Sequence, residues 1–282
     1  MKSEKLYIIL PVHNRVQLTS KFLDCLLEQT YRNYHLILVD DGSKDGTSEK
    51  VEATIPRDQL TVLRGDGSLW WAGALQKAYE YLIQQKNTDE DSVLIINDDT
   101  DFGPEFLEKG LSRLTHHNLL QAMACDGSYL NCEGGVYADL KRLTFVPTQD
   151  PKRINCLSTR GLLLKFTTFR GLGGFYPEKL PHYLSDYEYT IRARQKGFLL
   201  EVDPQFKLVM NQETTGVNAI TRRGVSYFLK TVFTNRYTGN PLHWSFFIVK
   251  TCPPLWVPFN IARVWTVFIR GLISSIVRQA FI

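Results

Sequence analysis

The sequence is poor in cysteine and has no paired-cysteine motif. Its five cysteines are scattered over 282 residues without a CxxC spacing, which excludes a common type of zinc site and the disulfide framework of a small secreted domain. We therefore expect reduced thiols and a cytosolic protein. Hydrophobic residues make up 44% and charged residues 22% of the chain, which excludes disordered and collagen-like chains. The N-terminal segment MKSEKLYIILPVHN shows no export-signal pattern.

Acidic residues are absent from the last part of the chain. Residues 214–282 contain eight Lys or Arg and no Asp or Glu, whereas residues 1–213 contain the other 25 basic residues and all 29 acidic ones. A purely basic segment that follows a neutral-to-acidic body indicates an anionic partner surface. The two candidates for this partner are a nucleic acid and a membrane.

Uninterrupted apolar runs of about 20 residues are also lacking, which argues against a membrane span. From Trp244 onward the chain is strongly apolar, but Lys250, Arg263, Arg270 and Arg278 interrupt it, and the longest uncharged stretch between these four is the 12 residues from 251 to 262. From 261 onward, polar and apolar residues fall on opposite sides of a predicted helix. Its polar side carries Arg263, Thr266, Arg270, Ser274 and Arg278, its apolar side carries Ile261, Val264, Trp265, Phe268, Leu272 and Ile276, and Pro253, Pro254 and Pro258 break the chain just before it. We expect this helix to lie on an anionic membrane without crossing it; packing on the body or on a second subunit is the alternative.

Apolar segments of β type alternate with helical periodicity through the first two-thirds of the chain. Strands are expected over residues 6–12, 35–39, 60–63 and 93–96, and helices over 16–27, 73–85 and 185–196. This alternation predicts an α/β fold in which a mostly parallel sheet is flanked by helices. Between residues 126 and 151, frequent Gly, Asn, Asp and Pro predict loops and short antiparallel strands.

Acidic residues directly follow two of the expected strands. Asp40 and Asp41 end the second strand in the run DDGSKDGT, and Asp98 and Asp99 follow the fourth strand in the run NDDTD. Ligands of open parallel sheets bind outside the carboxyl ends of the strands. A strand-to-helix turn explains the first pair equally well. The second pair predicts a Mg²⁺ or Mn²⁺ site that substrate phosphates complete, with a solvated acidic loop as the alternative.

Three further features have both a structural and a chemical interpretation. Asp186 follows Ser185 in the capping-box pattern S-x-x-E, where the helix dipole alone favours an acid, but the same carboxylate can serve as a general base. The adjacent Trp70 and Trp71 are expected in a glycine-flanked loop, where exposed rings suit stacking on a sugar or a base. His13, at the end of the first strand, is either a ligand-facing residue or an ordinary loop residue.

Five motifs occur in register between residues 6 and 212. In order they are IILPVHNR at 8–15, LEQTYRNYHLILVDDGSKDGT at 27–47, IINDDT at 95–100, RGLLLKFTTFRGLGGFYPE at 160–178 and YLSDYEYTIRARQKGF at 183–198. Together they resemble the successive signatures of family 2 glycosyltransferases with the GT-A fold. Within that family, the chain is most similar to the bacterial rhamnosyltransferase and galactofuranosyltransferase type enzymes that build cell-surface polysaccharides.

The resemblance implies an inverting transfer of a sugar from a UDP- or dTDP-sugar to a hydroxyl of a glycan or lipid-linked glycan, with Mg²⁺ or Mn²⁺ as cofactor. It implies a Rossmann-like GT-A catalytic domain over 1–213, divided into a nucleotide-sugar-binding half at 1–101 and an acceptor-binding half at 102–213. A basic, aromatic-rich helical tail then occupies 214–282. The implied location is cytoplasmic, peripheral on the inner face of the cell membrane, and the tail could also join two subunits in a homodimer.

The motifs also imply individual roles. Asp186 falls at the position of the catalytic base, and Asp98 and Asp99 fall at the metal and ribose-diphosphate motif, with Asp99 as the principal metal ligand. The nucleoside is contacted by Pro11, Val12 and His13, and its base edge by Asp41. We expect at least one of Trp70 and Trp71 to contact donor or acceptor, and we consider Arg192 and Arg194 either phosphate-neutralising or merely solvated helix residues.

The chain departs from the family pattern at two positions. Ser185 replaces the Glu that usually precedes the base, and Asn211 stands where many relatives carry a metal-binding His, so Asn211 is a weak candidate ligand. The alternative function is a non-catalytic sugar-nucleotide or nucleic-acid binding module with a basic tail. That alternative leaves Asp186, Asp98 and Asp99 without a purpose. The aromatic spacing of the tail does not resemble an RNA-binding signature, so we expect no nucleic-acid partner.

Overall fold

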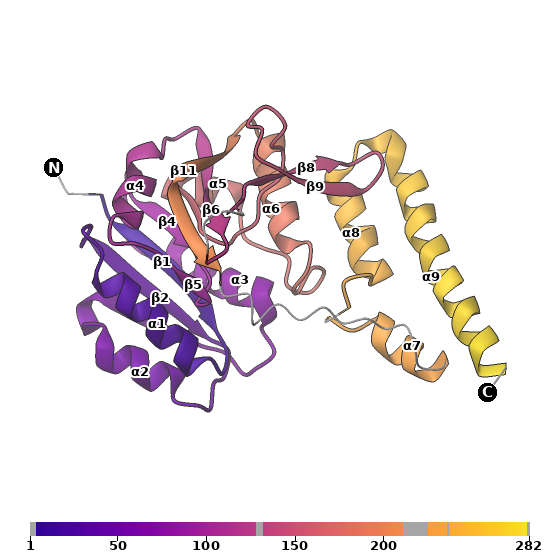
Figure 1. The fold of residues 1–282 in the computed structure, drawn as a ribbon, viewed down its shortest axis with the longest axis horizontal. Helices are drawn as coiled ribbons and strands as arrows, with labels where there is room; N and C mark the ends of the chain where they lie inside the picture. Colours follow the sequence, from indigo (N-terminus) through magenta and orange to yellow (C-terminus); the bar gives the residue numbers. More distant parts are fainter. Residues whose placement is uncertain (1–3, 128–131, 211–224, 236, 281–282) are drawn as a thin grey trace.

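A nine-stranded sheet lies at the centre of the computed structural model, which describes residues 4–127, 132–210, 225–235 and 237–280 (Figure 1). Its strands are β1 (Leu6–Val12), β2 (Tyr34–Asp40), β3 (Leu60–Arg64), β4 (Ser92–Ile95), β5 (Thr100–Asp101), β6 (Asn118–Cys125), β7 (Cys132–Glu133), β10 (Leu162–Lys165) and β11 (Leu199–Met210). A separate hairpin pairs β8 (Gly135–Asp139) with β9 (Thr144–Thr148).

Helices flank this sheet and form the C-terminal part. They are α1 (Val16–Leu27), α2 (Thr47–Thr54), α3 (Trp70–Ile83), α4 (Phe106–Arg113), α5 (Phe166–Leu172), α6 (Ser185–Gln195), α7 (Val225–Val232), α8 (Pro241–Thr251) and α9 (Val257–Ala280). Two short 3₁₀ helices occupy Arg57–Gln59 and Pro254–Trp256. The expected α/β architecture with a C-terminal helix is confirmed.

The strand order is β3-β2-β1-β4-β10-β6-β11-β5, with β7 paired to β6. The first four strands run parallel, as expected, whereas β10 runs antiparallel to both of its neighbours. The sheet is therefore parallel where the N-terminal motifs lie and mixed beyond β4. The carboxyl ends of β1, β2 and β4 meet at one edge, which places Asp41 and the Asp98–Asp99 pair at that edge.

The central strands β1, β2 and β4 are apolar along most of their length because both faces of the sheet are covered there. Ile8 and Leu10 of β1 face a core cluster that includes Phe22 of α1 and Phe106 of α4. Ile9, between them, faces a second cluster built with α3, α5 and α6. Successive side chains of β1 thus point alternately into two buried layers. This explains why the sequence of the strand is a continuous apolar run.

The C-terminal helices do not form a separate unit from the body. Phe247 of α8 is fully buried in a cluster with Ile191 of α6, and Gln195 of α6 donates a hydrogen bond to the Thr251 carbonyl at 3.1 Å. Helix α9 runs along α7 and α8 at the outer edge of the molecule (Figure 1). By length and composition alone, Pro254–Val277 is also apolar enough to cross a membrane.

Several local predictions are wrong. Cys125 and Cys132 form a disulfide across β6 and β7, so the expectation of reduced thiols fails for this pair. The capping box at α6 does not form: the helix follows Leu184, which has a left-handed φ of 69°, and the Ser185 hydroxyl donates instead to the His182 carbonyl. Gly197 does end that helix, with φ at 95°.

The tail also differs in detail from its predicted helix. Helix α9 begins four residues before 261, and the inner part of the predicted apolar side is half-buried against α7 and α8. Trp265, for example, donates a hydrogen bond from Nε1 to the Ser245 hydroxyl of α8 at 3.1 Å. Ile276 of the same predicted side is exposed. Helix α9 therefore packs on the rest of the protein, which was the alternative to membrane binding in the sequence analysis. A different apolar side of α9 faces outward.

Candidate active site

One hollow of about 640 Å³ gathers side chains from four of the five motifs. It lies at the carboxyl end of β4, between the first turns of α3 and α6, and the segment before α8 closes it. The charged and aromatic groups that line it include Arg15, Trp71, Asp99, Arg160, Asp186 and Trp244. Residues up to 229 positions apart in the chain, Arg15 and Trp244, thus share one solvent-accessible space, at the sheet edge where the sequence predicted a site.

The two adjacent aspartates of this site have different surroundings. Asp98 is 3% exposed, and its two carboxylate oxygens accept hydrogen bonds from Arg15 Nη1 at 2.8 Å and from Thr19 Oγ1 at 2.9 Å. Burial raises the pKa of Asp98, and the Arg15 guanidinium opposes that rise. Asp99 lines the hollow and accepts a second bond from Arg15 Nη1 at 3.2 Å. Asp98 therefore anchors Arg15, while Asp99 faces the space where a substrate fits.

A divalent cation has only partial support from the described residues. They contain no group of three or more His, Cys, Asp and Glu that could hold a metal by themselves. Mg²⁺ and Mn²⁺ commonly take one or two carboxylates and complete their shell with phosphate oxygens and water, and Asp99 fits that arrangement. Asn211, the weak third candidate, lies outside the described residues.

Asp186 is held at both oxygens by groups from three segments. Trp71 donates from Nε1 to Oδ1 at 2.8 Å, and the backbone N–H of Thr159 donates to Oδ2 at 3.2 Å. The Ser185 hydroxyl approaches Oδ1 at 3.3 Å. These hydrogen bonds from neutral donors fix the direction of the carboxylate. The Asp186 carboxylate is thus an oriented group in a hollow, which is what a general base requires.

The two segments that meet at Asp186 each contain a non-glycine residue with a left-handed backbone. Trp70, directly before Trp71, has φ at 57°, and Leu184, two residues before Asp186, has φ at 69°. Such residues cost of order 1–3 kcal/mol each and persist where the surroundings enforce them. The predicted loop position of the tryptophans is wrong, since both lie in the first turn of α3.

Asp41 fixes the segment that leads into α3. Its carboxylate is 8% exposed and accepts hydrogen bonds from the backbone N–H groups of Gly67 at 2.8 Å, Leu69 at 3.0 Å and Trp70 at 3.2 Å. His13 reaches the Asp41 carbonyl from Nδ1 at 2.6 Å. These residues lie at the same sheet edge as the hollow but do not line it. Their predicted contacts with a nucleoside, and those of Pro11 and Val12 at the end of β1, stay predictions.

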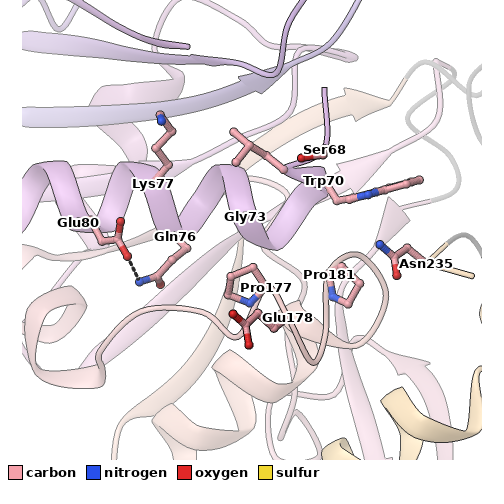
Figure 2. A pocket seen from close by; sticks show the side chains of 11 residues that line it. Ser68, Trp70, Gly73, Gln76, Lys77, Glu80, Pro177, Glu178, Pro181 and Asn235 are labelled. Carbon is pink, nitrogen blue, oxygen red and sulfur yellow. Dashed lines mark hydrogen bonds between the residues drawn. The ribbon is translucent and has the colours of Figure 1, made fainter. Parts of the chain in front are cut away.

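A second hollow of about 450 Å³ adjoins the first along α3. Figure 2 shows Trp70 and Asn235 pointing toward one another at one end of it, with Glu80 at the other end and Pro177 and Pro181 beside the helix. The Trp70 ring is 5.9 Å from the ring of His182, which lines the first hollow. Trp70 therefore lies where the two hollows meet.

Two arginines of the site were not recognised from the sequence. Arg15 and Arg160 both line the first hollow, and Arg160 also contacts the Met210 sulfur through Nη1. Arg15 ends the first motif and Arg160 begins the fourth, so their positions next to motif residues were the available signal. Arg192, by contrast, pairs with Glu188 and donates to the carbonyls of Leu172 and Gly174, which makes it a structural residue.

Comparison with known sequences places the N-terminal half in one family. The profile of glycosyl transferase family 2 matches residues 7–159. The Bacillus subtilis protein EpsE, named a glycosyltransferase, is 24% identical over 197 residues, which is 69% of this chain and 68% of EpsE. The Streptococcus pneumoniae glycosyltransferase GlyG is 36% identical over 56 residues, or 20% of this chain and 19% of GlyG. An uncharacterized glycosyltransferase of Rickettsia bellii is matched over only 8% of its length.

Comparison with solved structures gives the same fold at low identity. The Pyrobaculum calidifontis mannosyltransferase PcManGT, solved with GDP-Man and Mn²⁺, superposes with a TM-score of 0.58 at 18% identity over 96% of this chain and 72% of that chain. Staphylococcus aureus TarS 1–349, solved with UDP-GlcNAc, gives 0.58 at 15% identity over 98% and 75%. Both are GT-A glycosyltransferases, so the GT-A fold expected for this chain is confirmed.

Proposed function

Since this chain belongs to glycosyl transferase family 2, we propose that it moves a sugar from a nucleoside-diphosphate sugar to an acceptor hydroxyl with inversion at the anomeric carbon. The observation that carries this proposal is the placement of Asp186 and Asp99 in one hollow, each oriented by its own donors. Inverting transfer needs a base on the acceptor side and charge stabilisation on the leaving-group side. The two carboxylates supply one group for each need.

In this mechanism Asp186 accepts the proton of the acceptor hydroxyl as that oxygen attacks the anomeric carbon. The Trp71 indole N–H and the Thr159 backbone N–H keep the carboxylate aimed into the hollow. The enzyme holds the base and the acceptor in one geometry, so their translational and rotational entropy is already lost when the acceptor binds. The chemical step then has a lower barrier.

The departing diphosphate develops negative charge, and Arg15 and Arg160 are cations that line the same space. Asp99 is the proposed ligand for Mg²⁺ or Mn²⁺, with Asp98 holding Arg15 beside it; a bound cation would neutralise the leaving diphosphate. PcManGT with Mn²⁺ supports a cation in this fold.

The donor we propose is a UDP- or dTDP-sugar, and the acceptor a glycan or lipid-linked glycan of a cell-surface polysaccharide. A nucleoside-diphosphate donor is supported by the GDP-Man and UDP-GlcNAc complexes of the two similar structures. For the acceptor side we propose Trp70, because its ring lies at the junction of the two hollows, where an aromatic face can stack on a sugar ring. We place the reaction at the cytoplasmic face of the cell membrane.

The test compares Asp186→Asn with the native chain and with Asp24→Asn, a change of the same kind on the exposed side of α1. Donor binding is measured as thermal stabilisation by UDP and nucleotide sugars with Mn²⁺, since a ligand of the native state raises apparent stability. Turnover is measured as release of the nucleoside diphosphate, with the anomeric configuration of the product determined by NMR.

We expect Asp186→Asn to bind donor like the native chain and to lose at least a hundredfold in turnover, which is within the usual contribution of a general base. Asp24→Asn is expected to retain both. Native turnover in Asp186→Asn would overturn the assignment of the base. Donor binding without transfer or donor hydrolysis in the native chain, across acceptors, would favour the non-catalytic binding module instead.

A further inference from the structure

The described residues expose most of their large apolar side chains in the C-terminal helices. Of 17 such side chains, 13 lie between Tyr227 and Val277. Leu255, just before α9, is 82% exposed and Phe259 is 66% exposed, and Ile273, about four turns beyond Phe259, is 54% exposed. Phe259 and Ile273 fall within about 40° of one another around α9 at 3.6 residues per turn, and Leu255 lies in the 3₁₀ helix directly before the first residue of α9. They form one outward apolar stripe.

The opposite side of α9 is held by the protein. Asn260 is fully buried and donates from Nδ2 to the Leu140 carbonyl at 2.8 Å, and Phe268 packs on Phe228 of α7 with ring centroids 5.8 Å apart. These contacts seat the helix lengthwise on the molecule. A membrane span by the same helix would require their loss, so the outward stripe is presented parallel to a surface.

A basic hollow adjoins the start of this stripe. The turn between β8 and β9 and the first turns of α9 enclose about 620 Å³, lined by Lys141, Arg142, Arg263, Trp256 and Asp139 among others. Three cations against one carboxylate give it a net positive charge. Arg263 ties the two elements together, since its Nη1 donates to Asn260 Oδ1 at 2.9 Å and lies 3.4 Å from the Lys141 carbonyl.

From these observations we propose that the outward stripe of α9 and the β8–β9 hollow form one docking surface for an anionic phospholipid bilayer. Leu255, Phe259 and Ile273 enter the boundary between headgroups and acyl chains, as interfacial helices do. Lys141, Arg142 and Arg263 take the headgroup phosphates, and Trp256 lies between the two parts at the headgroup level. Binding of this surface to a bilayer does not depend on the sugar transfer proposed above.

Charge favours a bilayer over a second copy of this chain as the occupant. Residues 214–282 contain no Asp or Glu, so two copies joined through this surface would bring Arg263 and Arg270 of one against the same cations of the other. Like charges at such a contact disfavour association, whereas an anionic headgroup layer neutralises them. The hydrophobic stripe then meets a matching apolar layer behind the headgroups.

The test is co-sedimentation of the full chain with vesicles of phosphatidylglycerol and phosphatidylcholine, compared with pure phosphatidylcholine. Two double variants remove one part of the surface each: Leu255→Ser with Phe259→Ser, and Lys141→Gln with Arg142→Gln. Their controls are Leu199→Ser, an apolar side chain 54% exposed on β11, and Arg57→Gln, an exposed cation near β3. UDP-induced thermal stabilisation shows that each variant is folded, whatever the outcome for catalysis.

We expect the native chain and both controls to bind the anionic vesicles and to be released by carbonate at high pH. Each removed charge is expected to weaken binding about fivefold, so the Lys141 and Arg142 variant loses about 25-fold. The Leu255 and Phe259 variant is expected to lose at least tenfold. Equal binding by all variants would overturn the proposal, as would carbonate-resistant insertion or a concentration-dependent dimer that the Leu255 and Phe259 variant abolishes.

Discussion

At the scale of single residues, the hydrogen bond between Trp71 and Asp186 joins two residues that are 115 positions apart in the chain. Each oxygen of Asp186 has a short contact with one donor from outside α6, and the indole N–H is the nearer one at 2.8 Å. A hydrogen bond to a charged group contributes about 1.5–3 kcal/mol. Trp71→Phe keeps an aromatic ring at this position and removes the indole N–H, so it tests this bond with less loss of packing than an alanine substitution would cause.

We expect Trp71→Phe to lower kcat by roughly ten- to a hundredfold and to leave the KM for the donor nearly unchanged, because a misdirected base affects the acceptor proton rather than the diphosphate. Steady-state kinetics with a soluble acceptor provide the measurement. Trp256→Phe is the control, since that indole lies far from the site, beside the β8–β9 turn. A change in donor KM with unchanged kcat would assign Trp71 to donor binding instead.

The sequence identified Trp71 and Asp186 separately but gave no sign of their contact. A hydrogen bond between distant positions depends on how α3 and α6 approach each other, which no local spacing encodes. The same holds for Arg15, whose charge is visible in the sequence but whose pairing with Asp98 and Asp99 depends on the register of β1 beside β4. Residue types at motif positions were predictable, and their partners were not.

At the scale of elements, the buried strands were the most predictable parts. Residues 6–12 form a strand as expected because apolar side chains cover both faces, and β2 and β4 differ from their expected ranges by one residue at each end. The start of α6 at residue 185 was predicted correctly but its capping box was not, and the start of α3 was predicted three residues late, because tertiary contacts shape both helix starts. Trp70 and Leu184 adopt left-handed backbones that no propensity would assign to these residue types.

Gly161 allows the segment that carries Thr159 and Arg160 of the candidate active site to pack closely on β6 and β11. It precedes β10 with φ at 71°, and a Cβ there would lie 2.8 Å from the Cβ of Ala122 and 2.9 Å from Cδ2 of Leu208. We expect Gly161→Ala to lower the free energy of unfolding by about 2–4 kcal/mol, since backbone strain and overpacking add. It should also weaken catalysis, because Thr159 and Arg160 directly precede it.

Urea denaturation measures the effect, and Gly171→Ala is the matched control. Gly171 lies within α5, and no atom is within 4 Å of a Cβ built there. That substitution is expected to stabilise the protein by about 0.5–1 kcal/mol, because alanine has the higher helix propensity. Equal effects of both changes would show that β10 can shift to accommodate a methyl group.

At the scale of the whole molecule, buried tyrosines make stability sensitive to alkaline pH. Burial is the largest cause that raises the pKa of Tyr7 and Tyr187, each to about 12, and that raises the pKa of Tyr189 further still. Between about pH 10 and 12 the unfolded chain therefore loses phenolic protons that the folded chain keeps. The unfolded state then binds fewer protons, so stability falls as pH rises through this window.

We expect the free energy of unfolding to fall by up to about 1.4 kcal/mol per pH unit for each fully protonated buried tyrosine above pH 10. Urea denaturation at pH 8, 10 and 11 measures this slope. Tyr189→Phe should reduce it, and at pH 8 should stabilise the protein by about 1 kcal/mol, because among the described residues its buried hydroxyl has no hydrogen-bond partner. An unchanged slope would show that Tyr189 ionises in the folded state.

The division between body and tail is the last whole-molecule feature. The sequence placed it after residue 213, where acidic residues end, but charge is a surface property and does not report which helices share the core. Phe247 and Ile248 of α8 are fully buried, and Trp244 lines the candidate active site. From this packing we expect α8 to belong to the body and the removable part to begin after Cys252.

Two truncations test this boundary. A chain that ends at residue 240 loses the burial of Phe247 and Ile248, which we expect to lower the free energy of unfolding by about 4–6 kcal/mol. A chain that ends at residue 252 keeps α8, so it should retain most of the stability, UDP-induced thermal stabilisation and transfer to a soluble acceptor. It should fail only to bind anionic vesicles, because it lacks Leu255, Phe259 and Arg263. If both chains were equally stable in urea and equally active, α8 would be part of the tail, as the charge pattern first indicated.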